Sequence, residues 1–121
     1  FHSIGDRAAA RARAVTARSR ASEPRQPLAL LRIHRFLGQL ALEDGRADES
    51  AQQLAASREL AEACRFPFER ALTLLVEAEL HAASGDPATA HALLDAARTV
   101  CEPLGARPTL ERIAELEARL T

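Results

Sequence analysis

Small and apolar residues recur along this chain at steps of four, three and four, the spacing of one face of an α-helix. The stripe occurs three times, and each copy lies 40 residues after the one before it. These two leucines stand at the same place in the second and third copies. Small residues beside them let two helices approach closely while the leucine fills the space between. The three stripes are Ala10, Ala14, Ala17 and Ala21; Ser50, Leu54, Ser57 and Ala61; and Ala90, Leu94, Ala97 and Cys101.

The segments between these stripes are apolar over a wider arc. Residues 27–43 have one apolar face formed by Leu30, Ile33, Leu37 and Leu40, and other apolar residues lie beside it. A helix with so wide an apolar arc packs between neighbours on both flanks. Sustained alternation of apolar and polar residues, which indicates strands, is missing from the sequence. We therefore expect an all-α chain with helices over residues 6–21, 27–43, 47–63, 67–83, 87–103 and 108–120.

Glycine, aspartate and proline mark the expected helix ends. Gly5, Gly45 and Gly85 stand where a helix is expected to end in a left-handed residue, a conformation that suits glycine. Asp6 and Asp86 follow two of these glycines as candidate N-caps. Proline fits the first position of a helix, where its missing N–H costs nothing. Such prolines open the other class of helix at Pro27, Pro67 and Pro108.

The same 40-residue interval, which we call the repeat step, also relates Arg18, Arg58 and Arg98. Self-similarity at this scale is typical of stacked repeats, in which each unit buries its apolar face against its neighbours. We expect a right-handed stack of antiparallel helix hairpins. Because its first unit is half present and it begins with Phe, we expect the sequence to be a fragment of a larger protein. Its expected parts are 1–26, the second helix of a truncated repeat; 27–66 and 67–107, two repeats; and 108–121, a terminal helix.

Charge gives little indication of nucleic-acid or membrane binding. The net charge is −1, although residues 5–26 carry six arginines against two acids. Aromatic residues make up 3% of the chain, so bases would find few stacking partners. Direct contact with nucleic acid is therefore not expected, and no apolar run is long enough to span a membrane. The arginine-rich segment is interpreted as an exposed helix face that normally contacts a missing neighbour.

Composition indicates a cytoplasmic protein. All sixteen basic residues are Arg, which together with the abundant Ala indicates a GC-rich bacterial genome. Cys64 and Cys101 have neither the spacing of a metal site nor that of a redox pair. Each falls near the end of an expected helix, where a free thiol in apolar surroundings is the ordinary state. A reducing, cytoplasmic compartment is therefore expected.

The sequence contains no recognisable catalytic arrangement. The histidines His2, His34, His81 and His91 lack a partner carboxylate or Cys at ligand spacing, so no metal site is expected. A nucleophile beside a base and a glycine-rich phosphate loop are also missing. We expect neither an enzyme nor a bound cofactor.

The hairpin pattern resembles the tetratricopeptide (TPR) repeat. The matching residues are Leu37, Gly38, Gly45, Ser50, Leu54 and Ser57 in one unit, and Ala78, Gly85, Ala90, Leu94 and Ala97 in the next. The chain departs from the TPR pattern in lacking the usual Trp and Tyr, in having Glu77 where Leu is usual, and in its period of 40 rather than 34. The segment from Cys101 to Leu120, with its Leu-Gly-Ala-Arg-Pro turn, is similar to the end of the repeat region in large ATP-binding LuxR-type transcriptional regulators.

The resemblance implies a non-catalytic scaffold or sensor segment of such a regulator. Related ATPases linked to cyclases or kinases and a free-standing TPR adaptor remain alternatives. The implied partner is a protein, a peptide or a neighbouring domain, with a small-molecule inducer as a further alternative and the oligomeric state open.

Two interpretations of Arg18, Arg58 and Arg98 stay open: pairing with nearby acids, or contact with a partner. The implied binding groove is concave and lined by Arg32, Arg35, Gln39, Leu72, Leu75 and Glu79.

Overall fold

The computed structural model describes residues 4–21 and 26–120, with side chains from Gly5 to Ala17 and from Gln26 to Leu120. This part of the chain is all-α and contains no strand. Each end of each helix lies close to the expected position. The helices are α1 (Ile4–Ala21), α2 (Pro27–Glu43), α3 (Ala47–Ala63), α4 (Pro67–Ala83), α5 (Pro87–Leu104) and α6 (Arg107–Leu120).

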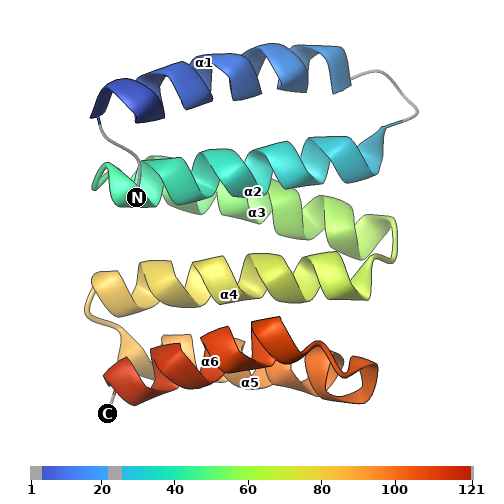
Figure 1. Cartoon of the computed structure of the whole chain (residues 1–121), viewed down its shortest axis with the longest axis vertical. Coiled ribbons are helices and arrows are strands. Elements are labelled where there is room, and N and C mark those ends of the chain that lie inside the picture. Colours follow the sequence, from blue (N-terminus) through green and yellow to red (C-terminus); the bar gives the residue numbers. More distant parts are fainter. Residues whose placement is uncertain (1–3, 22–25, 121) are drawn as a thin grey trace.

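Consecutive helices run in opposite directions, and along the long axis of the molecule α1 is followed by the pair α2 and α3, then by α4, and then by the pair α5 and α6 (Figure 1). The closest pairs are α2 with α3 and α4 with α5, each joined by a tight turn. Contacts also link α3 to α4, α1 to α2 and α5 to α6. Next-but-one contacts join α2 to α4 and α4 to α6. Helices α2 and α4 therefore have neighbours on several flanks, as their wide apolar arcs predict.

The glycine prediction is confirmed at two of its three positions. Gly45 and Gly85 have φ of 75° and 81°, in the left-handed region. Gly5 is different, because it lies inside the first turn of α1 rather than at a helix end. Asp86 caps α5 by accepting a hydrogen bond from the Thr89 backbone N–H at 3.2 Å.

The prediction for Asp6 is wrong. This residue lies within the first turn of α1 and therefore does not cap the helix. The physical reason is that no described helix ends just before Gly5. The turn that would place a capping residue at position 6 therefore does not form there.

One turn was not expected from the sequence. Arg65, between α3 and α4, has φ of 58°, a left-handed conformation that L-residues adopt at a cost. Gly105 occupies the corresponding turn one repeat step later, with φ of 64°. The two turns therefore have the same backbone form, with an arginine in one and a glycine in the other.

The second and third stripes are part of the buried core, as predicted. Leu54 and Leu94 are fully buried, and so are the small residues of their stripes. In α1, Ala10 and Ala14 are buried, whereas Ala17 is exposed. The side chains of Ala21 and Arg18 lie outside the described residues. Buried apolar side chains from α4, α5 and α6 form one continuous cluster: Ala71, Leu74, Leu75, Ala78, Ala90, Leu94, Ala97, Cys101, Ile113 and Leu116.

Two buried serines bind the backbone of the neighbouring helix. Ser50 donates to the carbonyl oxygen of Gly38, and Ser57 to that of Leu31, both at 2.8 Å. Gly38 permits this approach, because a Cβ built there would lie 2.7 Å from the Leu54 side chain. A side chain at position 38 would therefore keep α2 and α3 from approaching this closely.

The two ends of the structure differ. The outward face of α6 is exposed and largely polar, with Glu111, Arg112 and Glu115 among its residues. Leu31 and Ala71, which lie two repeat steps and one repeat step before Glu111, are both fully buried. The corresponding position on α6 is therefore charged and exposed. Among the described helices, none combines the length and apolarity needed to cross a membrane.

Candidate binding surfaces

The predicted groove residues of α2 bind α4. Arg32 donates from Nε and Nη2 to the two carboxylate oxygens of Glu69, at 3.1 and 3.0 Å. Arg35 donates from Nη2 to the same carboxylate at 3.0 Å and from Nη1 to the Glu69 backbone carbonyl at 3.2 Å. A single carboxylate thus joins two guanidinium groups across the α2–α4 contact. No local sequence signal indicated this, because nothing near Glu69 in the chain places it opposite α2.

The two arginines of this ion-pair cluster change the pKa of Glu69. The hydrogen bonds from Arg32, above all, and those from Arg35 hold the pKa of Glu69 below its ordinary value, against the opposing effect of burial. Glu69 is buried, while the Arg32 side chain is 56% exposed. The cluster therefore presents a guanidinium to solvent and keeps its carboxylate beneath.

The other predicted groove residues are divided between surface and core. Gln39 and Leu72 are half-buried. Glu79 on α4 accepts a hydrogen bond from Arg112 Nη2 on α6 at 3.0 Å. The prediction that Leu75 lines the groove is wrong, because its side chain is 1% exposed and packs in the α4–α5–α6 cluster. It faces inward since α6 covers that side of α4, so it cannot line an open groove.

An apolar pocket lies beside the Arg32–Glu69 pair. We call it the Phe66–Leu104 pocket; its volume is about 370 Å³. Leu104 is 61% exposed, the highest value for a large apolar residue in the described chain. Two of the four phenylalanines of the sequence flank Pro67 here, and this pair of aromatic residues is the signal by which the pocket could have been found in the sequence. The lining residues are Leu28, Arg32, Arg65, Phe66, Pro67, Phe68, Glu69 and Leu104.

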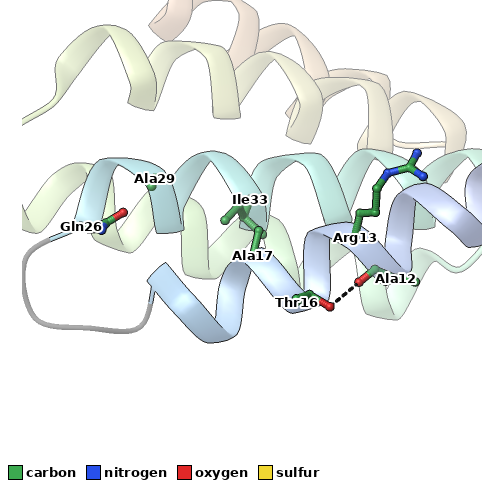
Figure 2. Close-up of a pocket in the computed structure, with 7 residues that line it drawn as sticks. All are labelled: Ala12, Arg13, Thr16, Ala17, Gln26, Ala29 and Ile33. Atoms are coloured by element: carbon green, nitrogen blue, oxygen red, sulfur yellow. Dashed lines mark hydrogen bonds between the residues drawn. The ribbon is translucent and has the colours of Figure 1, made fainter.

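A second hollow, the α1–α2 groove, runs between the first two helices (Figure 2). Its larger part has a volume of about 540 Å³. Figure 2 shows Ala17 and Ile33 at its centre, with Gln26 and Ala29 toward one end and Arg13 toward the other. The hollow continues past Phe36 and Arg32. The lining residues are Ala10, Ala12, Arg13, Ala14, Thr16, Ala17, Gln26, Ala29, Arg32, Ile33 and Phe36.

Two of the three in-register arginines, Arg58 and Arg98, pair with acids. Arg58 on α3 donates to Glu77 on α4 at 3.1 Å, and Arg98 on α5 donates to Glu117 on α6. Burial raises the pKa of Glu77, although Arg58 opposes this. The side chain of Arg18 lies outside the described residues, so its pairing is not defined. For Arg58 and Arg98 the geometry is that of the first interpretation, pairing with nearby acids.

The histidines do not converge on a site. His34 Nδ1 lies 2.7 Å from Gln53 Oε1, which joins α2 to α3 by a hydrogen bond. His81 Nδ1 lies 3.7 Å from Asp86 Oδ2 beside the α4–α5 turn. His2 lies outside the described residues. Across the described part of the chain, no three His, Cys, Asp or Glu residues gather as a metal site would require.

The two cysteines are free thiols, as expected. Cys101 is fully buried, and this burial raises the pKa of its thiol. Cys64 is half-buried at the end of α3.

Comparison with known protein families, with curated proteins and with solved structures gave no significant match. The described residues form an all-α arrangement of packed helices, with the α1–α2 groove and the Phe66–Leu104 pocket among its surface hollows.

Proposed function

We propose that this chain is a TPR-like α-solenoid, a right-handed stack of antiparallel hairpins with a 40-residue unit. Three observations support this. Pro27 and Pro67, one repeat step apart, open α2 and α4. Gly45 and Gly85 end helices in the same left-handed form. The ion pair Arg58–Glu77 recurs as Arg98–Glu117, with each partner displaced by one repeat step.

The solenoid serves as a non-catalytic scaffold that binds an acidic, partly apolar peptide at the Phe66–Leu104 pocket. The observation that carries this is the charge around the pocket. Arg32 and Arg65 line it and Arg35 lies behind them, against the single carboxylate of Glu69. These guanidinium groups exceed the carboxylates by two positive charges beside an exposed apolar surface. Arginine holds carboxylates well, and a leucine or aromatic side chain of the peptide would fill the pocket.

A peptide-display selection tests this function. Short random peptides are selected on the native chain and then titrated by fluorescence anisotropy. We expect selected peptides to combine Asp or Glu with Leu or Phe, and to lose at least about tenfold in affinity for Arg65→Glu or Leu104→Asp. Arg119→Glu makes the same change of charge at an exposed site outside the pocket and should leave binding unchanged.

The double variant Arg32→Glu/Arg35→Glu tests whether the predicted groove contributes to peptide binding. Circular dichroism first establishes that the variant stays helical. Loss of peptide binding by a folded variant is the expected result. Selected peptides that bind every folded variant with equal affinity would remove the pocket and the groove together.

The parent protein we propose is a bacterial LuxR-type ATP-dependent transcriptional regulator working in the cytoplasm. The similarity of the segment from Cys101 to Leu120 supports this assignment. Binding of a protein partner or a small inducer on the stack would then bias an attached ATPase or effector domain. The alternatives are a cyclase- or kinase-linked ATPase and a free-standing adaptor.

Sequencing the reading frame on both sides distinguishes these parents. A P-loop upstream together with a DNA-binding helix-turn-helix after Thr121 is the result expected for the regulator. Cyclase or kinase motifs would move the chain to the second class. Start and stop codons close to the two ends would make it a small adaptor.

A further inference from the structure

Two turns of this molecule have the same backbone but very different side chains. The α3–α4 turn and the α5–α6 turn lie one repeat step apart, and each passes through a left-handed residue, Arg65 in the first and Gly105 in the second. In both turns the next backbone N–H donates to a carbonyl oxygen of the preceding helix, at 2.9 Å from Phe66 and at 3.2 Å from Ala106. The turn therefore forms with a glycine and an alanine, and it does not need the larger side chains of the α3–α4 turn.

The backbone of Arg65 is strained. The left-handed conformation brings the Cβ of an L-residue close to a backbone carbonyl oxygen, whereas glycine adopts it freely. The Arg65 side chain does not offset this cost within the fold, because it is exposed and forms no ion pair or hydrogen bond with another described residue. Strain at a residue that does not stabilise the fold indicates a functional role.

The strained turn places Arg65 beside apolar surface. The α3–α4 turn lies at the same end of the molecule as the start of α2 and the end of α5 (Figure 1). These three segments supply the walls of the Phe66–Leu104 pocket, which Arg65 also lines. The apolar wall residues are Leu28 from α2, Phe66 and Phe68 from the turn and the start of α4, and Leu104 from the end of α5. A guanidinium group and an apolar hollow therefore lie together.

The other arginine that lines the pocket, Arg32, is already bound to a carboxylate. Its Nε and Nη2 donate to the two carboxylate oxygens of Glu69 at 3.1 and 3.0 Å. This is the bidentate geometry in which a guanidinium group holds a carboxylate most strongly. A peptide carboxylate would have to compete with Glu69 for these donors, whereas those of Arg65 are available. The two arginines therefore differ in what they can bind.

The size of the pocket limits where the peptide carboxylate can lie. A volume of about 370 Å³ accommodates one large apolar side chain rather than several. Arg65 directly precedes the wall residue Phe66, so a carboxylate bound to Arg65 lies at the edge of the pocket. Consecutive Cα atoms are about 3.8 Å apart. The acidic residue of the peptide should therefore be the immediate neighbour of the apolar residue that fills the pocket, or next but one.

We propose that Arg65 is the residue by which the Phe66–Leu104 pocket selects acidic peptides. Its guanidinium group binds the carboxylate of an Asp or Glu whose neighbouring Leu or Phe fills the pocket. Arg32 stays paired with Glu69 and adds positive charge without holding the peptide carboxylate. The left-handed turn lowers the stability of the fold and in return sets the guanidinium group beside the pocket. This assignment rests on the function proposed above and names the residue that determines its specificity.

Two peptide-display libraries test the assignment on the native chain. In one library an Asp or Glu precedes a Leu or Phe, with random flanking residues, and in the other an Asn or Gln replaces the acid. The acidic peptides of highest affinity and their carboxamide counterparts are then titrated by fluorescence anisotropy. We expect each acidic peptide to bind at least about tenfold more tightly than its carboxamide counterpart, a ratio that we call the acid preference.

Variants of the two pocket arginines should change the acid preference differently. Arg65→Gly removes the guanidinium group and should reduce the preference to less than about twofold. Arg32→Gln should leave a preference of at least about fivefold, because a charge that is already paired contributes only a screened, weaker attraction. Arg119→Gln removes an exposed arginine outside the pocket and should leave the preference unchanged.

Thermal unfolding tests the strain separately. Arg65→Gly should raise Tm by about 2 to 5 °C, because glycine relieves the left-handed turn. Arg65→Ala keeps a Cβ in that turn, so it should change Tm by less than about 1 °C while losing the acid preference as Arg65→Gly does. Opposite effects of Arg65→Gly on stability and on peptide binding are therefore expected.

Two results would overturn the assignment and leave the pocket as the binding site. One is an acid preference that survives Arg65→Gly and falls in Arg32→Gln, since Arg32 would then hold the carboxylate. The other is a lower Tm of Arg65→Gly, which would show that the arginine stabilises the fold. If neither library yields a peptide whose binding Leu104→Asp abolishes, the pocket is not a peptide site, and the proposed function and this assignment are both wrong.

Discussion

Leu54 shows what a single side chain contributes to this molecule. It lies on α3, meets Gly38 of α2, and packs with Val76 and Leu80 of α4. One leucine therefore contributes to the packing of three helices. Leu94 has the same position one repeat step later and lies in the α4–α5–α6 cluster. Because both are fully buried, their removal leaves a cavity that rigid helices cannot close.

The first prediction concerns these two leucines. Leu54→Ala and Leu94→Ala should each lower the free energy of unfolding by about 2 to 5 kcal/mol, from lost burial and the remaining cavity. Urea denaturation followed by circular dichroism measures the change. Leu104→Ala, at an exposed position, is the matched control and should cost far less. A loss under about 1 kcal/mol for the buried pair would contradict the packing described.

The second prediction concerns Glu69 and pH. Its pKa is lower in the folded protein, so the ionised carboxylate stabilises the fold above its unfolded-state pKa near 4.5, and this contribution is lost as pH falls through the folded pKa. Glu69→Gln should therefore be less stable than the native chain at pH 7, with the difference shrinking toward pH 3.

Urea titrations at several pH values measure this difference, and Glu102→Gln, at an exposed glutamate, is the control. A gap between native chain and Glu69→Gln that stays constant from pH 7 to pH 3 would show that the effect does not come from the charge of Glu69.

At the scale of elements, proline and glycine made the helix bounds predictable from the sequence. Both act on the local backbone, so no knowledge of the tertiary structure is needed to place them. The misplaced Gly5 shows the limit, since a glycine also fits the first turn of a helix. The left-handed Arg65 was missed because nothing in an arginine indicates a positive φ.

The candidate sites were less predictable than the helices. Sequence periodicity placed Arg32 and Arg35 on one face, but only the fold brings Glu69 against them from the next hairpin. Leu75 is buried for a similar reason, because α6 returns to cover α4. Contacts between distant segments decide which polar groups are already paired, and a local pattern does not contain that information.

The third prediction concerns the α2–α3 contact at Gly38. Gly38→Ala should destabilise the native chain, because the new Cβ meets the Leu54 side chain at 2.7 Å. In a Leu54→Ala background the same substitution should instead stabilise by up to about 1 kcal/mol, since alanine is the better helix former. A double-mutant cycle in urea measures this change of sign. Equal effects in the two backgrounds would mean that the helices do not meet at Gly38.

At the scale of the whole molecule, α4 buries more of its residues than the described part of α1. Between Gly5 and Ala17, α1 buries two alanines of its stripe, while α4 buries eight residues along its length. Local opening follows the amount of buried contact, so the helices should not open together.

The fourth prediction is that backbone amides of α1 exchange with solvent faster than those of α4 and α5. Native-state hydrogen exchange measures this, with α6 as the comparison because it also lies at an end of the structure. Equal protection across all the described helices would show that the molecule opens as a single unit.

The exposed Glu111 on α6 has a consequence for how copies of the molecule could assemble. A protein with complementary adhesive surfaces at both ends can join head to tail without limit and form filaments. Here the α6 end carries charge where Leu31 and Ala71 are buried elsewhere, while the α1 end has an apolar groove. The two ends of the described structure are therefore not both apolar, and a head-to-tail contact between copies would bury the charge of Glu111.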